Sequence, residues 1–250
     1  MQTPAERRLI DRTARYLEAL AGDCLVLNIG AGSSAVIEDS LSTMGARFIC
    51  DRLDVDDCRV LHPAVRDCHV ASVESMPLPD GAYKIAFANY VIEHVGDVPA
   101  AAREIARVLQ PGGRFIVSAP NPRAPEFMLS RFTPLWFHRY IRETNEPGHG
   151  AHETHYAYES IDHLVRIFRQ SGLHMVNAAY YANTHSYLNH IPLIDLASRA
   201  YDAFVGGLNL RFLMGNVCLT FKKPVPAAPQ DNGHRNGTAS TTASTTRAPS

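Results

Sequence analysis

Residues 25–32 read Leu-Val-Leu-Asn-Ile-Gly-Ala-Gly, an apolar run that ends in two closely spaced glycines. The run from Cys24 to Ile29 predicts a buried strand, and residues 35–44 have the pattern of a helix. Gly30 permits a tight exit from the strand, and Gly32 lets a ligand lie directly on the backbone because no Cβ intervenes. We therefore expect a strand, a tight turn and a helix whose N-terminus points at a ligand.

Asp51 supplies a second candidate binding element. It stands 19 residues after Gly32, at the end of a short strand predicted over 46–50. There a carboxylate can accept hydrogen bonds from both hydroxyls of a ribose. Residues 30–35 also satisfy the pattern G-x-G-x-x-G/A, so these features by themselves fit an NAD-dependent oxidoreductase as well. The purely structural alternatives are an ordinary tight turn for residues 30–35 and a strand-terminal cap for Asp51.

Strand and helix patterns alternate along the chain. Further strands are predicted over 85–89, 114–118, 174–181 and 216–221, and helices over 4–20, 98–109 and 161–171. The segment from Asp51 to His69 is polar and irregular. Alternation of this kind predicts a parallel sheet that helices cover on both faces.

The domain organisation follows from where the pattern breaks. We expect one domain over 1–225, with two excursions over roughly 121–157 and 183–210. The first excursion is rich in aromatic residues and histidine. Residues 226–250 consist largely of Pro, Ala, Ser, Thr, Gly and Asn, so a disordered tail is expected there.

Composition excludes several classes of protein. The formal net charge is −1 and the 24 Lys and Arg residues are scattered, which argues against a nucleic-acid partner. The start of the chain lacks an apolar leader and no apolar run is long enough to span a membrane. The five cysteines are Cys24, Cys50, Cys58, Cys68 and Cys218. They show no paired metal spacing, so we expect reduced thiols in a cytoplasmic protein.

Three later segments carry a more specific signal. They read Ser-Met-Pro-Leu-Pro-Asp-Gly-Ala-Tyr over 75–83, Asn-Tyr-Val-Ile-Glu-His-Val over 89–95 and Arg-Val-Leu-Gln-Pro-Gly-Gly over 107–113. In this order and spacing they resemble class I S-adenosylmethionine-dependent methyltransferases that modify small molecules, well over 20–120 and loosely elsewhere. The resemblance implies a doubly wound, mostly parallel α/β sheet of seven strands, with helices on both faces and the last strand, 216–221, antiparallel.

The resemblance also implies S-adenosylmethionine as the cofactor. Its expected contacts are Asn28, Gly30, Ala31, Gly32, Asp51, Ser72, Val73 and Asn89. Three positions depart from the family pattern: Asn28 and Ser72 stand where acids often contact the methionine and adenine portions, and Lys84 replaces the usual Asp of the fourth strand. These departures keep open a second interpretation, a non-catalytic relative that binds the cofactor or only keeps the fold.

His94 is the first candidate for a general base, because a hydroxyl acceptor must lose its proton and histidine is suited to remove it. Glu93 is the second candidate, and both residues could instead cap or brace a helix. His152 and His155 are further candidates for catalysis or substrate contact, with metal binding and ordinary loop packing as the alternatives. No metal is assigned, because Tyr90 stands where some relatives that methylate quinone precursors carry a metal-binding acid.

The two excursions are expected to form a helical and aromatic lid over the ligand-binding edge. The expected acceptor is a small molecule, most simply one methylated on a hydroxyl oxygen, and nitrogen and carbon are the alternative acceptor atoms. Lipid-linked and polysaccharide precursors are among the candidates. Aromatic residues interleaved with cations over 127–142 also suit contact with a membrane surface, and packing on the sheet is the alternative. The sequence leaves the oligomeric state open.

Overall fold

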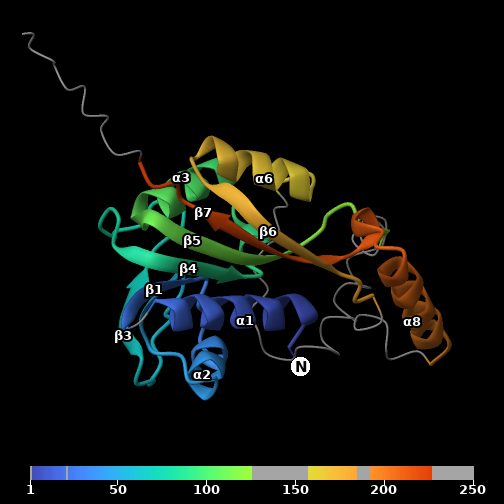
Figure 1. Cartoon of the computed structure of the whole chain (residues 1–250), viewed down its shortest axis with the longest axis horizontal. Helices are drawn as coiled ribbons and strands as arrows, with labels where there is room; N and C mark the ends of the chain where they lie inside the picture. Colours follow the sequence, from blue (N-terminus) through green and yellow to red (C-terminus); the bar gives the residue numbers. More distant parts are fainter. Residues whose placement is uncertain (1, 21, 126–156, 185–191, 227–250) are drawn as a thin grey trace, which may run out of the picture.

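The computed structural model describes residues 2–20, 22–125, 157–184 and 192–226, the side chains of 192–195 excepted (Figure 1). Its strands are β1 (Cys24–Ile29), β2 (Phe48–Asp54), β3 (Val65–Val70), β4 (Tyr83–Asn89), β5 (Leu109–Pro120), β6 (His174–Tyr181) and β7 (Asn216–Lys222). Its helices are α1 (Pro4–Ala19), α2 (Val36–Thr43), α3 (Val98–Val108), α6 (Ile161–Gln170) and α8 (Pro192–Gly207), with 3₁₀ turns η1 (Ile92–His94) and η2 (Arg211–Leu213).

The described strands form one sheet of order β3-β2-β1-β4-β5-β7-β6. Strands β1 to β5 pair in parallel, whereas β7 is antiparallel to both of its neighbours, β5 and β6. This confirms the predicted mostly parallel sheet with an antiparallel final strand. Such a sheet needs cover on both faces, which explains why β1 is apolar almost throughout.

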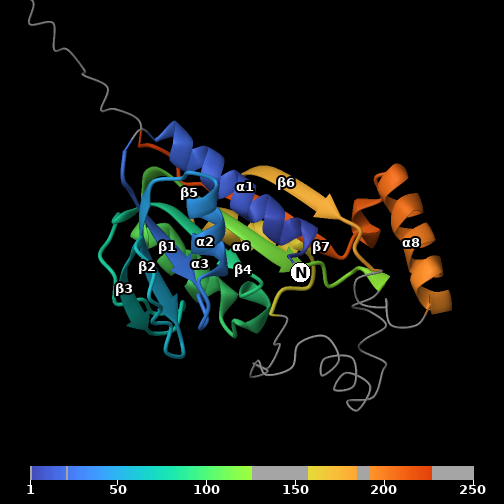
Figure 2. The ribbon, with the colours of Figure 1, turned by 90° about the horizontal axis from the view of Figure 1, so that it is seen from below.

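Helices cover both faces of the sheet. In Figure 1, α1 and α2 lie below it and α3 and α6 lie above it, and Figure 2 shows α1 and α2 from below. On one side Leu9 and Leu41 pack with Phe87, and on the other Ile105 and Phe168 join the main apolar cluster. In both views α8 stands apart from the sheet, beyond the carboxyl ends of β4 and β6.

Helix starts follow the caps that the sequence provides. Thr3 Oγ1 accepts the Glu6 N–H at the start of α1, Asp97 Oδ1 accepts the Ala100 N–H at the start of α3, and Ser160 Oγ accepts the His163 N–H at the start of α6. Pro4 and Val98-Pro99 then occupy the first turns of α1 and α3, where no N–H partner is needed.

Two expectations for residues 46–69 are wrong. Strand β2 runs to Asp54, so Asp51 lies within the strand and not at its end. Strand β3 occupies part of the segment expected to be irregular. It is an edge strand with largely exposed or half-buried side chains, so its sequence lacks the apolar pattern of a buried strand.

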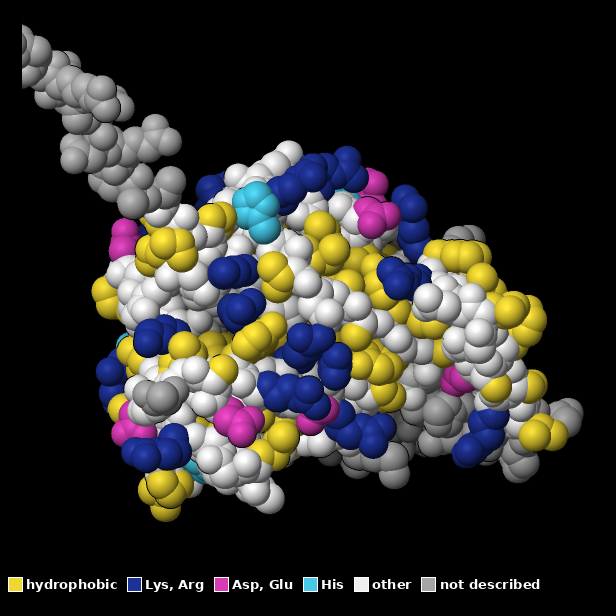
Figure 3. Space-filling view, viewed as in Figure 1, with side chains coloured by type: hydrophobic (Ala, Val, Ile, Leu, Met, Phe, Trp, Pro, Cys, Tyr) yellow, Lys and Arg dark blue, Asp and Glu magenta, His cyan; other side chains and the backbone are white. Residues whose placement is uncertain are grey.

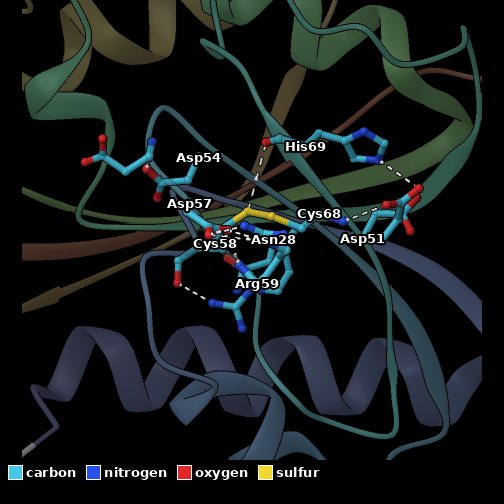
Figure 4. Close-up of a disulfide and its surroundings, with 12 residues drawn as sticks. Asn28, Asp51, Asp54, Asp57, Cys58, Arg59, Cys68 and His69 are labelled. Atoms are coloured by element: carbon cyan, nitrogen blue, oxygen red, sulfur yellow. Dashed lines mark hydrogen bonds and ion pairs between the residues drawn. A yellow bond between two sulfur atoms is a disulfide. The ribbon is translucent and has the colours of Figure 1, made fainter.

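The expectation of five reduced cysteines is also wrong. Cys24, Cys50 and Cys218 are buried thiols, but Cys58 and Cys68 form a disulfide (Figure 4). The loop after β2 folds back along β3 and brings their Cα atoms within 6.0 Å. The disulfide therefore joins that loop to the edge strand, a pairing that spacing alone did not indicate.

Several expectations concern residues outside those described. These are the aromatic segment 127–142, the candidate residues His152 and His155, and nearly all of the expected tail. Much of the second excursion is the helix α8. No helix in the described parts of the chain is both long and apolar enough to cross a membrane.

Candidate functional site

A cavity of about 510 Å³ lies at the carboxyl edge of the parallel strands. Its wall comes from the loops after β1, β2, β3 and β4 and from η1, and contains Ile29, Gly30, Gly32, Ser33, Leu53–Asp57, Ala71–Glu74, Asn89–Val91, His94 and Val95. This edge is where open α/β sheets bind ligands, because several strand ends converge there.

The glycine turn forms one wall of the cavity. Gly30 and Gly32 have φ values of 66° and 61°, a region that side chains rarely adopt. A Cβ on Gly30 would lie 2.2 Å from Val91 Cγ2, whereas a Cβ on Gly32 would meet no atom within 4 Å. A side chain at position 30 would therefore collide with Val91 in the turn after β4, whereas the space next to the Gly32 backbone is open.

Gly30→Ala is expected to lower the free energy of unfolding by about 1–3 kcal/mol more than Gly32→Ala. Both substitutions introduce the same backbone strain, so the difference reports the contact with Val91. Urea unfolding of both variants measures it. Adding Val91→Ala to Gly30→Ala is expected to remove most of the difference, and an undiminished difference would contradict the contact as its cause.

A buried arginine holds the glycine turn from beneath. The Arg52 side chain is fully buried, and its Nη2 donates to the carbonyl oxygens of Ala31, Gly32 and Ser34 at 2.7, 3.1 and 2.8 Å. Its Nη1 donates to Glu38 Oε1 at 3.1 Å. One guanidinium therefore satisfies three carbonyls of the turn and the buried carboxylate of α2.

Asn28 belongs to this network. Its Nδ2 donates to Glu38 Oε1 at 2.8 Å, and its side chain is buried and does not line the cavity. The carboxylate that is missing at position 28 is thus present close by, on Glu38. The sequence predicts neither Glu38 of α2 nor Arg52 of β2 at the site, because burial of a charged side chain has no local sequence signature.

Asp54 connects the glycine turn to the loop after β2. Its Oδ2 accepts the Gly32 N–H at 2.8 Å and its Oδ1 accepts the Asp56 N–H at 3.0 Å. It ends β2 and lines the cavity, which is the place expected for Asp51. Asp54 is not among the contacts predicted from the sequence.

Asp51 lies elsewhere. It is 1% exposed, accepts from Arg66 Nε at 2.9 Å and from the Tyr83 hydroxyl at 2.7 Å, and does not line the cavity. It joins β2 to Arg66 of the neighbouring strand β3 and to Tyr83 of β4, which lies on the far side of β1. The expected position at the strand end is wrong because β2 continues through Arg52, whose charge is buried and paired.

The wall of the cavity is acidic. The charged residues that line it are Asp54, Asp56, Asp57 and Glu74, without a lysine or arginine among the described lining residues. Arg59 hydrogen-bonds Asp57 and lowers the pKa of that carboxyl to about 2 (Figure 4). A ligand that carries positive charge suits such a wall.

Comparison with known proteins identifies a domain within the chain. The model of the methyltransferase domain family matches residues 27–117, which contain the glycine turn, Asp54, Asn89 and His94. Residues 27–117 form a methyltransferase domain. A probable S-adenosylmethionine-dependent methyltransferase of Mycolicibacterium smegmatis is 35% identical over 117 residues, which are 45% of this chain and 43% of that protein. The chain spans less than half the length of the curated relatives that it matches first.

Solved structures agree on the fold. The YcgJ protein of Bacillus subtilis has a TM-score of 0.53 at 19% identity, covering 87% of this chain and 99% of that one. The geranyl diphosphate C-methyltransferase of Streptomyces coelicolor, solved with S-adenosyl-L-homocysteine, has a TM-score of 0.53 at 17% identity, covering 87% and 80%. At these identities the likeness shows that the methyltransferase domain has the family's fold.

Six of the residues expected from sequence come together at the cavity of the methyltransferase domain. They are Gly30, Gly32, Ser72, Val73, Asn89 and His94. Ser72 Oγ accepts the Glu74 N–H at 3.1 Å, and Asn89 Oδ1 accepts from the Ser118 hydroxyl. Asn28, Ala31, Asp51 and Glu93 are absent from the wall. Their predicted contacts with cofactor or substrate have no support in this geometry.

Glu93 and His94 face different surroundings although they are adjacent. Glu93 is 5% exposed, and burial raises the pKa of its carboxyl to about 8. At neutral pH it is therefore largely protonated, which makes it a poor general base. His94 lines the cavity, so it is the better placed of the two.

Tyr90 is a further cavity residue that is not among the contacts predicted from the sequence. Its φ of 55° is unusual outside glycine, and it lines the cavity. Its hydroxyl donates to Asn216 Oδ1 at 2.9 Å and lies 3.0 Å from Thr3 Oγ1. The turn after β4 is thus tied to the start of both α1 and β7.

Proposed function

We propose that this chain transfers a methyl group from S-adenosylmethionine to a small-molecule acceptor, most simply to a hydroxyl oxygen. The observation that supports this most is the acidic cavity between the glycine turn and Asp54, at the carboxyl edge of a methyltransferase domain. When bound, S-adenosylmethionine supplies a methyl group on a positively charged sulfur.

The residues at the cavity fit this cofactor. The open space above Gly32 allows close approach to the backbone, and the four lining carboxylates favour a cation. Asp54 has one carboxylate oxygen on the Gly32 N–H and the other on the Asp56 N–H, with lone pairs left for ribose hydroxyls. Ser72, Val73 and Asn89 line the rest of the proposed cofactor site.

The acceptor is proposed to bind beside Tyr90 and His94. Both residues follow β4, next to Asn89, so they adjoin the proposed cofactor position. Alignment of two bound reactants is the main contribution that a methyltransferase makes, worth about 7–11 kcal/mol in well-oriented systems. Lipid-linked and polysaccharide precursors are acceptors of the same kind if they present a hydroxyl.

Calorimetric titration with S-adenosylmethionine, S-adenosylhomocysteine and NAD tests the cofactor. Binding of the first two and not of NAD is expected. Asp54→Asn is expected to weaken S-adenosylmethionine binding about ten- to a hundredfold, because hydrogen bonds to a charged group contribute about 1.5–3 kcal/mol. Asp67→Asn, the same change on an exposed residue of β3 outside the cavity, is the control and is expected to bind normally.

Two results would contradict the proposal. Binding of NAD alone would indicate an oxidoreductase. Binding of neither S-adenosyl compound by a folded protein would indicate a relative that keeps the fold without the cofactor, the interpretation that Asn28, Ser72 and Lys84 had kept open.

A further inference from the structure

A second cavity, of about 270 Å³, lies at the opposite end of the sheet from the proposed cofactor site. The starts of β4 and β5, the end of β7 and the last turns of α1 enclose it. Its lining residues are Tyr16, Ala19, Leu20, Lys84, Ile85, Gln110–Arg114 and Lys222. It shares no residue with the acidic cavity.

The wall of this second cavity is basic, whereas the wall of the first cavity is acidic. Lys84, Arg114 and Lys222 line it, and its described lining contains no carboxylate. Among the described residues, none of these three cations forms an ion pair with Asp or Glu. Figure 3 shows Lys and Arg side chains gathered over α1 and the adjoining strands, although the whole chain has a net charge of −1.

Strand pairing places two of these cations side by side. Arg114 and Lys222 are register partners on the antiparallel strands β5 and β7, so their side chains leave the same face of the sheet. Like charges directly opposite each other destabilise a strand pair. An anion between them would turn this repulsion into attraction.

Neighbouring contacts hold the cavity in a defined form. The Arg114 guanidinium carbon lies 4.2 Å from the centre of the Tyr16 ring, which restricts where its N–H groups point. Gln110 Nε2 donates to the Ala82 carbonyl at 3.2 Å. Lys223, by contrast, is engaged elsewhere, since its Nζ donates to the carbonyls of Ala106 and Leu109 at 2.6 and 2.7 Å.

We propose that this cavity is a second ligand site, which binds a phosphate group between Lys84, Arg114 and Lys222. Arginine presents several N–H donors in a plane that matches phosphate oxygens, and the two lysines add positive charge. The volume suits free phosphate or the phosphate end of a larger molecule. The site is separate from methyl transfer and does not depend on it.

Inorganic phosphate titrated into the full chain by calorimetry tests the proposal, with chloride at equal ionic strength as the reference. Phosphate is expected to bind and to raise the Tm, and chloride is not. Lys222→Gln and Arg114→Gln are each expected to weaken phosphate binding about ten- to a hundredfold, as expected for charge-assisted hydrogen bonds. Lys222→Gln removes a like charge opposite Arg114, so its Tm in chloride is not expected to fall.

Arg166→Gln is the matched control, because it removes one positive charge from an exposed residue of α6 outside the cavity. It is expected to bind phosphate as the wild type does. A parallel arm measures sedimentation with phosphatidylcholine vesicles with and without phosphatidic acid. If the protein sediments only with vesicles that contain phosphatidic acid, and Lys222→Gln abolishes this sedimentation, the phosphate is assigned to a lipid headgroup.

The proposal is overturned if neither probe binds more strongly than chloride or plain vesicles. It is overturned equally if Arg166→Gln weakens binding as much as the two cavity variants do. S-adenosylmethionine titrations of the same variants separate the two sites, because the proposed cofactor site is expected to be unaffected.

Discussion

Arg52→Met is expected to lower the free energy of unfolding by about 3–5 kcal/mol, the range for breaking a buried ion pair from one side. Glu38 would keep a fully buried carboxylate without its cation, and three carbonyls of the glycine turn would lose their donor. Urea unfolding at neutral pH measures the loss. Because the turn is one wall of the proposed cofactor site, the variant is also expected to bind S-adenosylmethionine poorly under conditions where it is folded.

Two variants show whether burial is the cause. Arg59→Met breaks an exposed ion pair, in which the Arg59 side chain is 80% exposed, and about 0–1 kcal/mol is expected. Arg52→Met combined with Glu38→Gln removes both charges and is expected to be more stable than Arg52→Met alone. Equal losses of unfolding free energy in Arg52→Met and Arg59→Met would refute the conclusion that Arg52 stabilises the glycine turn.

His94→Ala is expected to reduce turnover of a hydroxyl acceptor about 10²- to 10⁴-fold, the usual contribution of a general base. The reason is its place in the cavity wall after β4, beside Asn89 and Tyr90. A panel of hydroxyl compounds with labelled methyl donor provides the assay. The affinity for S-adenosylmethionine is expected to stay within a few-fold of the wild type, because His94 is proposed to act on the acceptor and not to bind the cofactor.

A control variant elsewhere in the fold and the pH dependence of turnover distinguish a catalytic role of His94 from a structural one. His174→Ala, on the exposed start of β6, is the control and is expected to turn over normally. The wild-type rate is expected to fall at acid pH, where a base is protonated, and His94→Ala is expected to lose that dependence. Unchanged turnover by folded His94→Ala would remove His94 from the mechanism.

Local patterns predicted most of the architecture. The bounds of β6 matched the expected 174–181, and α1, α2, α3 and β7 each lie within two residues of their expected ends. Strand and helix periodicity depends on neighbours a few positions apart, so a single sequence contains it. The order of the motifs over 75–113 then indicated the family, and the glycines at 30 and 32 marked the turn.

The site was predicted only in part, since its remaining residues depend on contacts between distant segments. Arg52 is held by Glu38 and Ala31, which are 14 and 21 positions away in the chain. Whether the strand ends at Asp51 or Asp54 depends on whether the intervening arginine is buried. The Cys58–Cys68 pair likewise depends on the loop returning along β3.

The sequence by itself determined that the chain forms a doubly wound methyltransferase fold with a glycine turn after its first strand. Only the tertiary structure decided which acid lines the cavity, what supports the glycine turn and where like charges meet. The physical reason is that periodicity and turn chemistry are local, whereas burial and charge pairing arise when remote segments pack together. Asp54, Arg52 and the Arg114–Lys222 pair therefore acquire their roles only in the folded chain.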